Sequence, residues 1–277
     1  MNEILVVNKP SGYTSRDVVN KLTKIFHEKR IGHTGTLDPM ATGVLVVCIG
    51  KYTKLNLELT SLEKEYTATM KLGIETDTLD ITGNITKTLD KKIKLDQIQK
   101  VFSEFPHEYL QSVPKYSAVK INGKKLYEYA RENTEIKLPK RMVKIYSLEL
   151  MSYENNIIKF KTKVSKGTYI RSLIRDIANL LGTVAVMESL IRTKQGNFSL
   201  EDSYNLESIE NNEFEFIPLT KALDYKVLDG NLNKIKYINV NKVLENIEDG
   251  KYFIKIDNDI KSIYEFKDKL GKPKIMF

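Results

Sequence analysis

One short segment concentrates the residues that could do chemistry. Residues 32–43, GHTGTLDPMATG, combine three glycines, three threonines, a histidine, a proline and a single carboxylate, Asp38. The glycines permit backbone paths that side chains forbid, and Pro39 biases Asp38 towards extended geometry. Asp38 is therefore either a chemically active carboxylate or a turn residue bonded to its own backbone. For an isolated Asp-Pro pair the turn is the more common role, so the residues alone leave both open.

Other kinds of site fit the sequence poorly. His27, His33 and His107 are scattered and lack a Cys or His at ligand spacing, which argues against zinc. Residues 50–53, GKYT, resemble the end of a phosphate loop, but Leu45 occupies the position where that loop requires glycine. Neither G-x-G-x-x-G opening a helix nor a Gly-x-Ser-x-Gly elbow occurs. We expect an enzyme that works without metal or dissociable cofactor.

Length and composition suggest an ordinary globular protein with a polyanionic partner. The 277 residues suffice for one large and one small domain. No apolar run approaches the roughly 18 to 20 residues of a membrane helix, and the N-terminus lacks a signal-peptide pattern. A single cysteine, Cys48, excludes an internal disulfide, so we expect a reduced, cytoplasmic protein without membrane contact. The net charge of +8 is compatible with nucleic acid but does not require it.

The charges are distributed unevenly along the chain. Residues 119–146 interleave basic side chains with tyrosines, a pattern suited to RNA. Residues 201–217 carry six acidic side chains and no Lys or Arg. We therefore expect the acidic stretch to face away from a phosphate backbone.

The N-terminal elements must position the Asp38 segment. Residues 3–7 read as a short buried strand, and Thr14 and Asp17 form a capping box for a helix ending near Arg30. Residues 44–49, VLVVCI, are apolar throughout and suit a central strand buried on both faces. The helix has one apolar stripe, made by Val18, Val19, Leu22, Ile25 and Phe26.

The middle of the chain predicts further strands and a second helix. Residues 65–72 alternate as a half-buried strand, and 142–150 and 157–164 alternate similarly around a short turn. Thr168 is expected to open a helix that ends at Gly182. Its core face is predicted from the apolar positions Ile170, Leu173, Ile174, Ile177, Leu180 and Leu181.

These elements predict an α+β fold: a mixed, largely antiparallel sheet core with flanking helices, plus a small β-rich C-terminal appendage. We expect a catalytic domain over residues 1–230, with an insertion at 115–145, and a second region over 231–277.

Six ordered motifs resemble those of the TruB family of pseudouridine synthases. GHTGTLDPMATGVL resembles the family's active-site motif, and VVNKPSGYTS its first motif. KEYTATMKLGIETDTLDITG, VPKYSAVKINGKKLYEYAR, SKGTYIRSLIRDI and LIRTKQGNFSL resemble later segments in the family's order. The resemblance covers roughly residues 3 to 200. It favours Asp38 as a chemically active carboxylate over Asp38 as a turn residue.

The resemblance implies that the chain converts the uridine at position 55, in the T loop of tRNA, to pseudouridine. Asp38 would be the nucleophile acting on a flipped-out base, at either the ribose anomeric carbon or the uracil ring. An adjacent Arg171 would favour its charged form. The family's substrate-binding positions correspond to His33, Tyr66, Tyr169, Arg171 and Leu190.

The resemblance also implies how RNA is held. The insertion at 115–145 would grip the T-arm backbone through Lys120, Lys124, Lys125, Lys140 and Arg141. Full-length members carry a PUA-like RNA-binding module, so residues 231–277 would be a shortened or divergent version. We expect tRNA as the partner of a monomer with no obligatory protein partner. The alternatives are a noncatalytic tRNA-binding protein and a guide-RNA-directed synthase.

Overall fold

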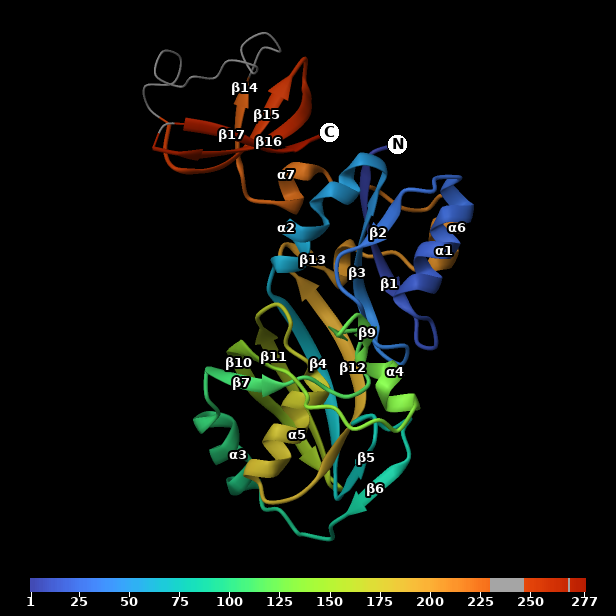
Figure 1. The fold of residues 1–277 in the computed structure, drawn as a ribbon, viewed down its shortest axis with the longest axis vertical. Helices are drawn as coiled ribbons and strands as arrows, with labels where there is room; N and C mark the ends of the chain where they lie inside the picture. The colour runs from blue at the N-terminus through green and yellow to red at the C-terminus, as the bar shows by residue number, and fades with distance from the viewer. Residues whose placement is uncertain (230–246, 269) are drawn as a thin grey trace.

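The computed structural model describes residues 1–229, 247–268 and 270–277. Its main feature is a mixed sheet of nine strands, seven of which form a continuous path (Figure 1). In spatial order these are β1 (Glu3–Lys9), β3 (Thr42–Ile49), β12 (Ala185–Gln195), β4 (Lys64–Leu72), β11 (Ile157–Val164), β10 (Lys140–Glu154) and β7 (Glu108–Ser112). Two short strands add to it, β2 (Ile31–His33) on β3 and β13 (Phe198–Ser199) on β12. The sheet confirms the predicted α+β class.

The N-terminal part of the sheet is covered on both faces. Helix α1 (Ser15–Phe26) packs Val18 and Leu22 against one face of β1 and β3. On the other face, Val44 and Val46 meet Leu59 of α2 (Asn56–Ser61) in a second core cluster. The predicted burial of residues 44–49 is therefore confirmed, because layers cover both faces of β3.

Helix α1 begins as predicted and ends earlier. The Thr14 N–H donates to Asp17 at 2.9 Å and the Asp17 N–H to Thr14 Oγ1 at 3.0 Å, which completes the capping box. His27 then takes a left-handed conformation with φ of 50°. The predicted end near Arg30 is wrong, because a residue with that φ stops the helix.

The other half of the sheet carries helices α3 (Leu95–Glu104) and α5 (Ile170–Leu180) on one face (Figure 1). Buried residues alternate with half-buried ones along β4, as predicted. Strands β10 and β11 form the expected hairpin, with two left-handed residues, Asn155 and Asn156, in its turn. Together these helices and strands bury one hydrophobic core between them.

Helix α5 departs from the prediction at its start and at one core position. Tyr169, not Thr168, occupies the N-cap position, while the Thr168 hydroxyl donates to the Ser165 carbonyl at 2.9 Å. Leu180 is 59% exposed, so its assignment to the core face is wrong. The helix ends as predicted before Gly182, whose φ is 69°.

Two halves of the sheet meet at a short parallel junction between β3 and β12, which we call the seam. Its register pairs Ile191 with Thr42 and Arg192 with Gly43. Gly43 has a φ of 99°, and a Cβ there would lie 2.3 Å from the Arg192 carbonyl oxygen. The seam therefore requires glycine at this position.

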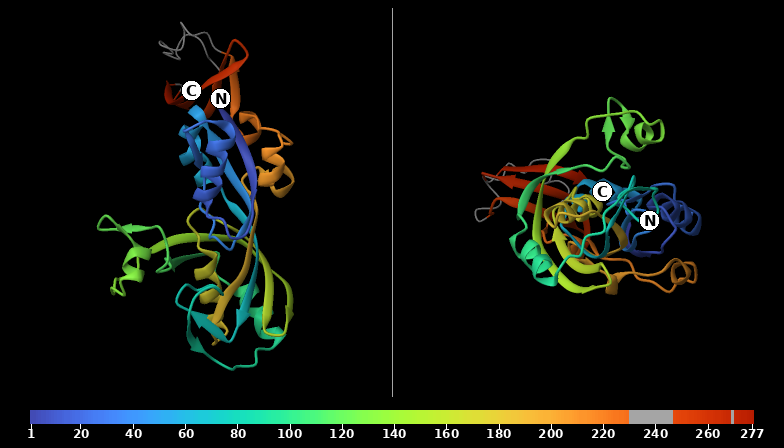
Figure 2. Two further views of the ribbon diagram at one scale, coloured as in Figure 1. Left: turned by 90° about the vertical axis from the view of Figure 1, so that its right-hand side faces the viewer. Right: turned by 90° about the horizontal axis from the view of Figure 1, so that it is seen from below.

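Residues 113–139 leave the sheet between β7 and β10 and project from the body as an arm (Figure 2). The arm contains β8 (Lys120–Ile121), β9 (Lys124–Lys125) and α4 (Leu126–Arg131). Leu126 and Ala130 are buried within it. The acidic stretch 201–217, with η2 (Leu200–Asp202) and α6 (Leu206–Glu210), lies on the opposite side of the body from the arm (Figure 2).

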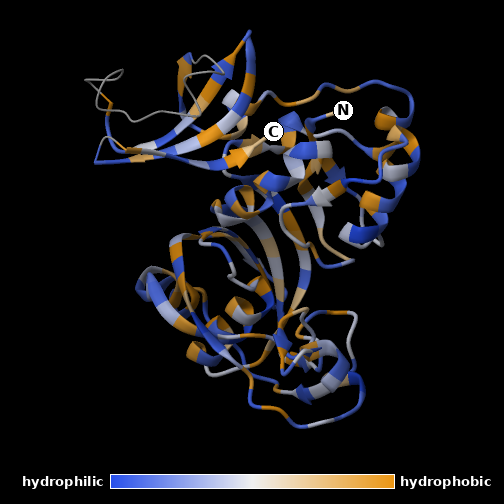
Figure 3. Cartoon of the chain, turned by 45° about the horizontal axis from the view of Figure 1, so that its top comes forward, coloured by the Kyte–Doolittle hydropathy of each residue, from blue (hydrophilic) through white to orange (hydrophobic). Residues whose placement is uncertain are grey.

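A separate sheet closes the chain. It consists of β14 (Lys226–Asp229), β15 (Gly250–Ile256), β16 (Asp259–Lys267) and β17 (Leu270–Met276), with hydrophobic and hydrophilic residues alternating along the strands (Figure 3). Lys251 and Tyr225 bind the Glu58 carboxylate of α2 at 2.7 and 3.0 Å. The predicted boundary between 230 and 231 lies outside the described residues.

The connecting elements are short. They are η1 (Gly50–Leu55), β5 (Ile74–Thr76), β6 (Ile85–Thr88) and α7 (Leu219–Ala222). No helix in the described residues is long and apolar enough to cross a membrane.

Candidate active site

A pocket of about 700 Å³ lies beside the seam, where the Asp38 loop, the root of the arm, β4, β12 and the start of α5 converge. Its volume is typical of small-ligand sites. Among the residues that line it are five of the six predicted catalytic and substrate-binding side chains: Asp38, Tyr66, Tyr169, Arg171 and Leu190.

The Asp38 loop, residues 34–41, is held by backbone bonds from three directions. The Thr34 N–H donates to the Val46 carbonyl at 3.0 Å, and the Leu37 N–H to Ser15 Oγ at 2.9 Å. The Gly12 N–H donates to the Pro39 carbonyl at 2.9 Å. Because these donors and acceptors come from β3, α1 and the loop before α1, the loop has a defined path.

Lys9 reinforces this loop from beneath. Its side chain is fully buried, and Nζ donates to the carbonyls of Pro10, Tyr13 and Pro39 at 2.8, 2.6 and 3.1 Å. Burial lowers the pKa of Lys9 to about 8, although Asp38 nearby raises it. Lys9 thus joins the loop before α1 to the Asp38 loop through backbone carbonyls.

Arg171 makes the expected ion pair with Asp38, with 2.9 Å between Nη2 and Oδ1. Its guanidinium also donates to the carbonyls of Thr78 and Tyr116 at 2.9 and 3.1 Å. The Arg171 side chain is only 6% exposed, whereas that of Asp38 is 30% exposed. The arginine is therefore fixed by the protein, while the carboxylate remains open to the pocket.

A second carboxylate, which sequence reasoning missed, approaches Arg171 from the other side. Asp80 Oδ2 lies 3.8 Å from Nη1. Asp80 accepts bonds from Thr78 Oγ1 at 2.9 Å, and from the backbone N–H and Oγ1 of Thr82 at 3.1 and 2.5 Å. The signal was present in the TDTLDITG segment, where hydroxyls flank an aspartate at short spacing. Arg171 lies between two carboxylates, only one of which lines the pocket.

Tyr66 and Leu190 form a wall of the pocket. They lie on the neighbouring strands β4 and β12 and are 7% and 6% exposed. Both are thus mainly buried, with a remaining surface that faces the pocket.

Tyr169 is positioned by its backbone and its ring. Its N–H donates to Gln111 Oε1 at 2.8 Å, and Gln111 Nε2 donates back to its carbonyl at 3.2 Å. Gln111 is fully buried on β7 and also donates to Tyr109 at 2.8 Å. The Arg141 guanidinium lies 5.4 Å from the centre of the Tyr169 ring. Gln111 carried no sequence signal, because its partners are distant along the chain.

His33 lies apart from these residues. It belongs to β2 and does not line the pocket. Burial first, and then Arg16 and Arg192, lower its pKa to about 4. Its Nδ1 is buried and has no hydrogen-bond partner within the described part of the chain.

The five predicted RNA-backbone residues occupy two places. Lys120, Lys124 and Lys125 lie on the arm, whereas Lys140 and Arg141 begin β10. Arg141 contacts Tyr169, so it belongs to the pocket's edge more than to the arm.

The arm's own contacts combine cations with tyrosines. The Lys124 ammonium pairs with Glu132 and lies 4.9 Å from the Tyr129 ring centre. Lys125 and Arg131 lie 5.2 and 5.4 Å from the ring of Tyr127. Tyr127 and Arg131 also line the main pocket, so the arm contributes to it directly.

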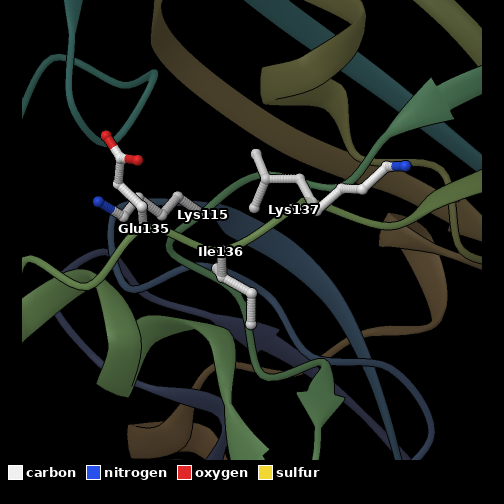
Figure 4. Close-up of a pocket in the computed structure, with 5 residues that line it drawn as sticks. Lys115, Glu135, Ile136 and Lys137 are labelled. Carbon is white, nitrogen blue, oxygen red and sulfur yellow. The ribbon is translucent and has the colours of Figure 1, made fainter.

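A second hollow of about 500 Å³ lies along the arm and is lined by Lys115 and residues 135–138 (Figure 4). The side chains of Glu135 and Lys137 point away from each other (Figure 4). No group of three His, Cys, Asp or Glu side chains in the described residues could hold a metal ion.

Two family models match the chain in succession. The TruB family pseudouridylate synthase N-terminal domain matches residues 23–170, and the tRNA pseudouridylate synthase B C-terminal domain matches residues 171–228.

Similar proteins include the tRNA pseudouridine synthase B of Mesoplasma florum, 46% identical over 83% of this chain and 82% of that protein. That of Clostridium tetani is 47% identical over 80% of this chain and 78% of its own length. Among solved structures, a chain in the crystal structure of a Cbf5-Nop10-Gar1 complex matches with a TM-score of 0.72 and 25% identity. The match covers 99% of this chain and 82% of that one.

Proposed function

The chain belongs to the TruB family of pseudouridylate synthases and is a tRNA pseudouridine synthase, an isomerase; we propose that it acts on uridine 55 in the T loop, with Asp38 as nucleophile. The observation that carries this proposal is the Asp38–Arg171 pair at a pocket, with the arginine buried and the carboxylate open. A charged carboxylate in contact with a binding cavity is suited to attack carbon.

The reaction exchanges one bond of the ribose for another. The bond from the anomeric carbon to N1 of uracil breaks, the base turns, and the anomeric carbon joins C5. N1 gains a proton and the C5 hydrogen is released, so atoms balance without an oxidant or reductant. Asp38 forms a covalent adduct at the anomeric carbon or at the ring, which divides the exchange into easier steps. Arg171 pairs with Asp38 and holds its carboxylate at the pocket.

The pocket walls support a flipped-out base. Tyr66 and Leu190 offer apolar surface on one side. Tyr169 lies at the rim, where Arg141 contacts its ring and Gln111 binds its backbone. Stacking on aromatic rings offsets the few kcal/mol that base extrusion costs. His33 lies outside the pocket lining, so we propose for it a contact with RNA beyond the base.

RNA binding is proposed to extend from the pocket along the arm. Lys120, Lys124, Lys125, Lys140 and Arg141 would contact T-arm phosphates. We further propose that residues 1–230 form the catalytic domain and that 231–277, which include β15 to β17, form a shortened PUA-like region. The protein would act as a monomer, without guide RNA or an obligatory protein partner.

The test is tritium release from a T-arm RNA labelled at C5 of the target uridine, with the purified chain alone. Asp38→Asn removes the charge and nucleophilicity while preserving shape, so we expect no release and nearly unchanged RNA binding. Asp90→Asn, an exposed aspartate outside the pocket, is the matched control and should react like the wild type. Appreciable release by Asp38→Asn would refute the assignment of the nucleophile, and no release by the wild type would refute the substrate.

A further inference from the structure

The pocket carries more positive charge than its one carboxylate requires. Four cations line it, Lys64, Arg131, Arg171 and Arg192, against Asp38 alone. Arg171 is paired with Asp38, and Arg131 lies over a tyrosine ring. Lys64 and Arg192 remain without a use in the mechanism described above.

Both of these cations are buried and incompletely bonded. Lys64 is 7% exposed, and its Nζ donates only to the carbonyls of Thr60 and Leu62, at 2.6 and 2.7 Å. Arg192 is 1% exposed; its Nε donates to the Val44 carbonyl at 2.7 Å and its Nη2 to that of Gly35 at 2.9 Å. One Lys64 N–H and Arg192 Nη1 therefore have no acceptor in the residues that the structure describes.

The two cations lie close together against the Asp38 loop. A Cβ built on Gly35 would lie 3.3 Å from Arg192 Nη1 and 3.8 Å from Lys64 Cε. Gly35 itself lines the pocket, and its lack of a side chain leaves the space beside both cations open.

The pair has no carboxylate partner in the described part of the chain, where neither residue forms an ion pair. Burial, Arg192 and the exposed Lys166 lower the pKa of Lys64 to about 8. Two like charges removed from water without an anion are unfavourable, and an anion bound between them removes the penalty.

Resting on the proposed function, we infer that Lys64 and Arg192 form a subsite for one phosphodiester group next to the reacting uridine. RNA brings one phosphate on each side of every nucleotide, so a flipped uridine in this pocket carries an anion to the same place. The open Arg192 Nη1 and the third N–H of Lys64 supply two charge-assisted donors. This contact is separate from the arm, and it fixes the sugar end of the nucleotide relative to Asp38.

The test is RNA binding in the full-length Asp38→Asn protein, which separates affinity from turnover. Adding Lys64→Gln should lower the slope of log affinity against log salt by nearly one, as expected for one lost phosphate contact. It should leave the melting temperature of the RNA-free protein unchanged or higher, because a buried charge is removed. Lys64→Arg, which keeps the charge, should retain most of the slope. Lys71→Gln, on the same strand but outside the pocket, should change neither quantity.

The second part of the experiment replaces the phosphates on either side of the target uridine, one at a time, by uncharged methylphosphonates. At one of the two positions, the affinity of this RNA for the Asp38→Asn protein that retains Lys64 should fall about tenfold, the scale of a hydrogen bond to a charged group. The same RNA should weaken binding to the Lys64→Gln protein by less than about twofold, because the partner is already absent. Equal losses in both proteins at both positions, or a lower melting temperature with an unchanged salt slope, would show that Lys64 only supports the loop. Either result stands whether or not the wild type forms pseudouridine.

Discussion

Replacing Arg171 by lysine tests whether the Asp38 carboxylate depends on its buried partner. The arginine reaches Asp38 and the carbonyls of Thr78 and Tyr116 at once, through two nitrogens of one planar group. A lysine keeps the charge but is a single point, so it cannot hold all three partners. A hydrogen bond to a charged group contributes about 1.5–3 kcal/mol. If lysine settles on the two carbonyls, Asp38 loses that contribution. Because each 1.4 kcal/mol of activation free energy changes the rate about tenfold, turnover then falls about 10- to 200-fold.

The assay is single-turnover tritium release with enzyme in excess, so that RNA affinity does not limit the rate. Arg175→Lys is the matched control, because Arg175 lies on the same helix and pairs with Asp176 outside the pocket. The control should react at the wild-type rate, and thermal melting should show that both variants fold. An Arg171→Lys rate within about threefold of the wild type would refute the dependence of Asp38 on this partner.

Four further predictions address the remaining residues. Tyr66→Phe should slow turnover about 100-fold if the hydroxyl moves a proton. If only stacking matters, Tyr66→Phe should react normally and Tyr66→Ala should lose about 1–3 kcal/mol of binding free energy. Wild-type turnover by the Ala variant would remove Tyr66 from the site. Changing Lys124 and Lys125 together to Ala should lower the salt slope of RNA binding and leave the single-turnover rate at saturating enzyme unchanged; an unchanged slope would mean that RNA does not contact this part of the arm. The pKa of His33 is lowered to about 4, so between pH 6.5 and 4 the unfolded chain takes up a proton that the folded chain does not. Stability should therefore fall by up to about 3 kcal/mol as pH falls through that window, and urea unfolding of His33→Asn at pH 7 and 4.5 should show a smaller fall than the wild type. Gln111→Leu leaves the Tyr169 N–H without its acceptor, which should cost about 1–3 kcal/mol of stability and slow turnover; wild-type values for both in melting and tritium-release assays would contradict a positioning role.

Local patterns in the sequence predicted local structure well. The capping box of Thr14 and Asp17 and the alternation along β4 are both determined by neighbours a few residues away, and the structure has both. The end of α1 was placed too late because His27 carries no strong signal for a left-handed conformation. Spacing alone assigns Leu180 to the core, but its side chain is exposed, and the core face at this end of α5 is made by Ile177, Ala178 and Leu181.

The residues of the site can be predicted from the sequence only where they belong to a recognised motif. Asp38 and Arg171 could be paired in advance through the resemblance. Lys64, Gln111 and Arg192 could not, because their hydrogen-bond partners are mainly backbone carbonyls and amides, and every residue type supplies those. Which carbonyl faces which cation is decided by tertiary packing of segments far apart in the chain, and no short pattern records it.

The seam between β3 and β12 has a consequence for the order in which the enzyme is built. Asp38 precedes one side of the seam, while Leu190 and Arg192 lie on the other, about 150 residues later in the chain. Closing so long a loop costs entropy that only the completed contacts return. A chain emerging from the ribosome can fold β1, α1 and β3 early, but it has no complete pocket until β12 is released. The chain can therefore modify RNA only late in its synthesis, when most of residues 1–230 have already been made.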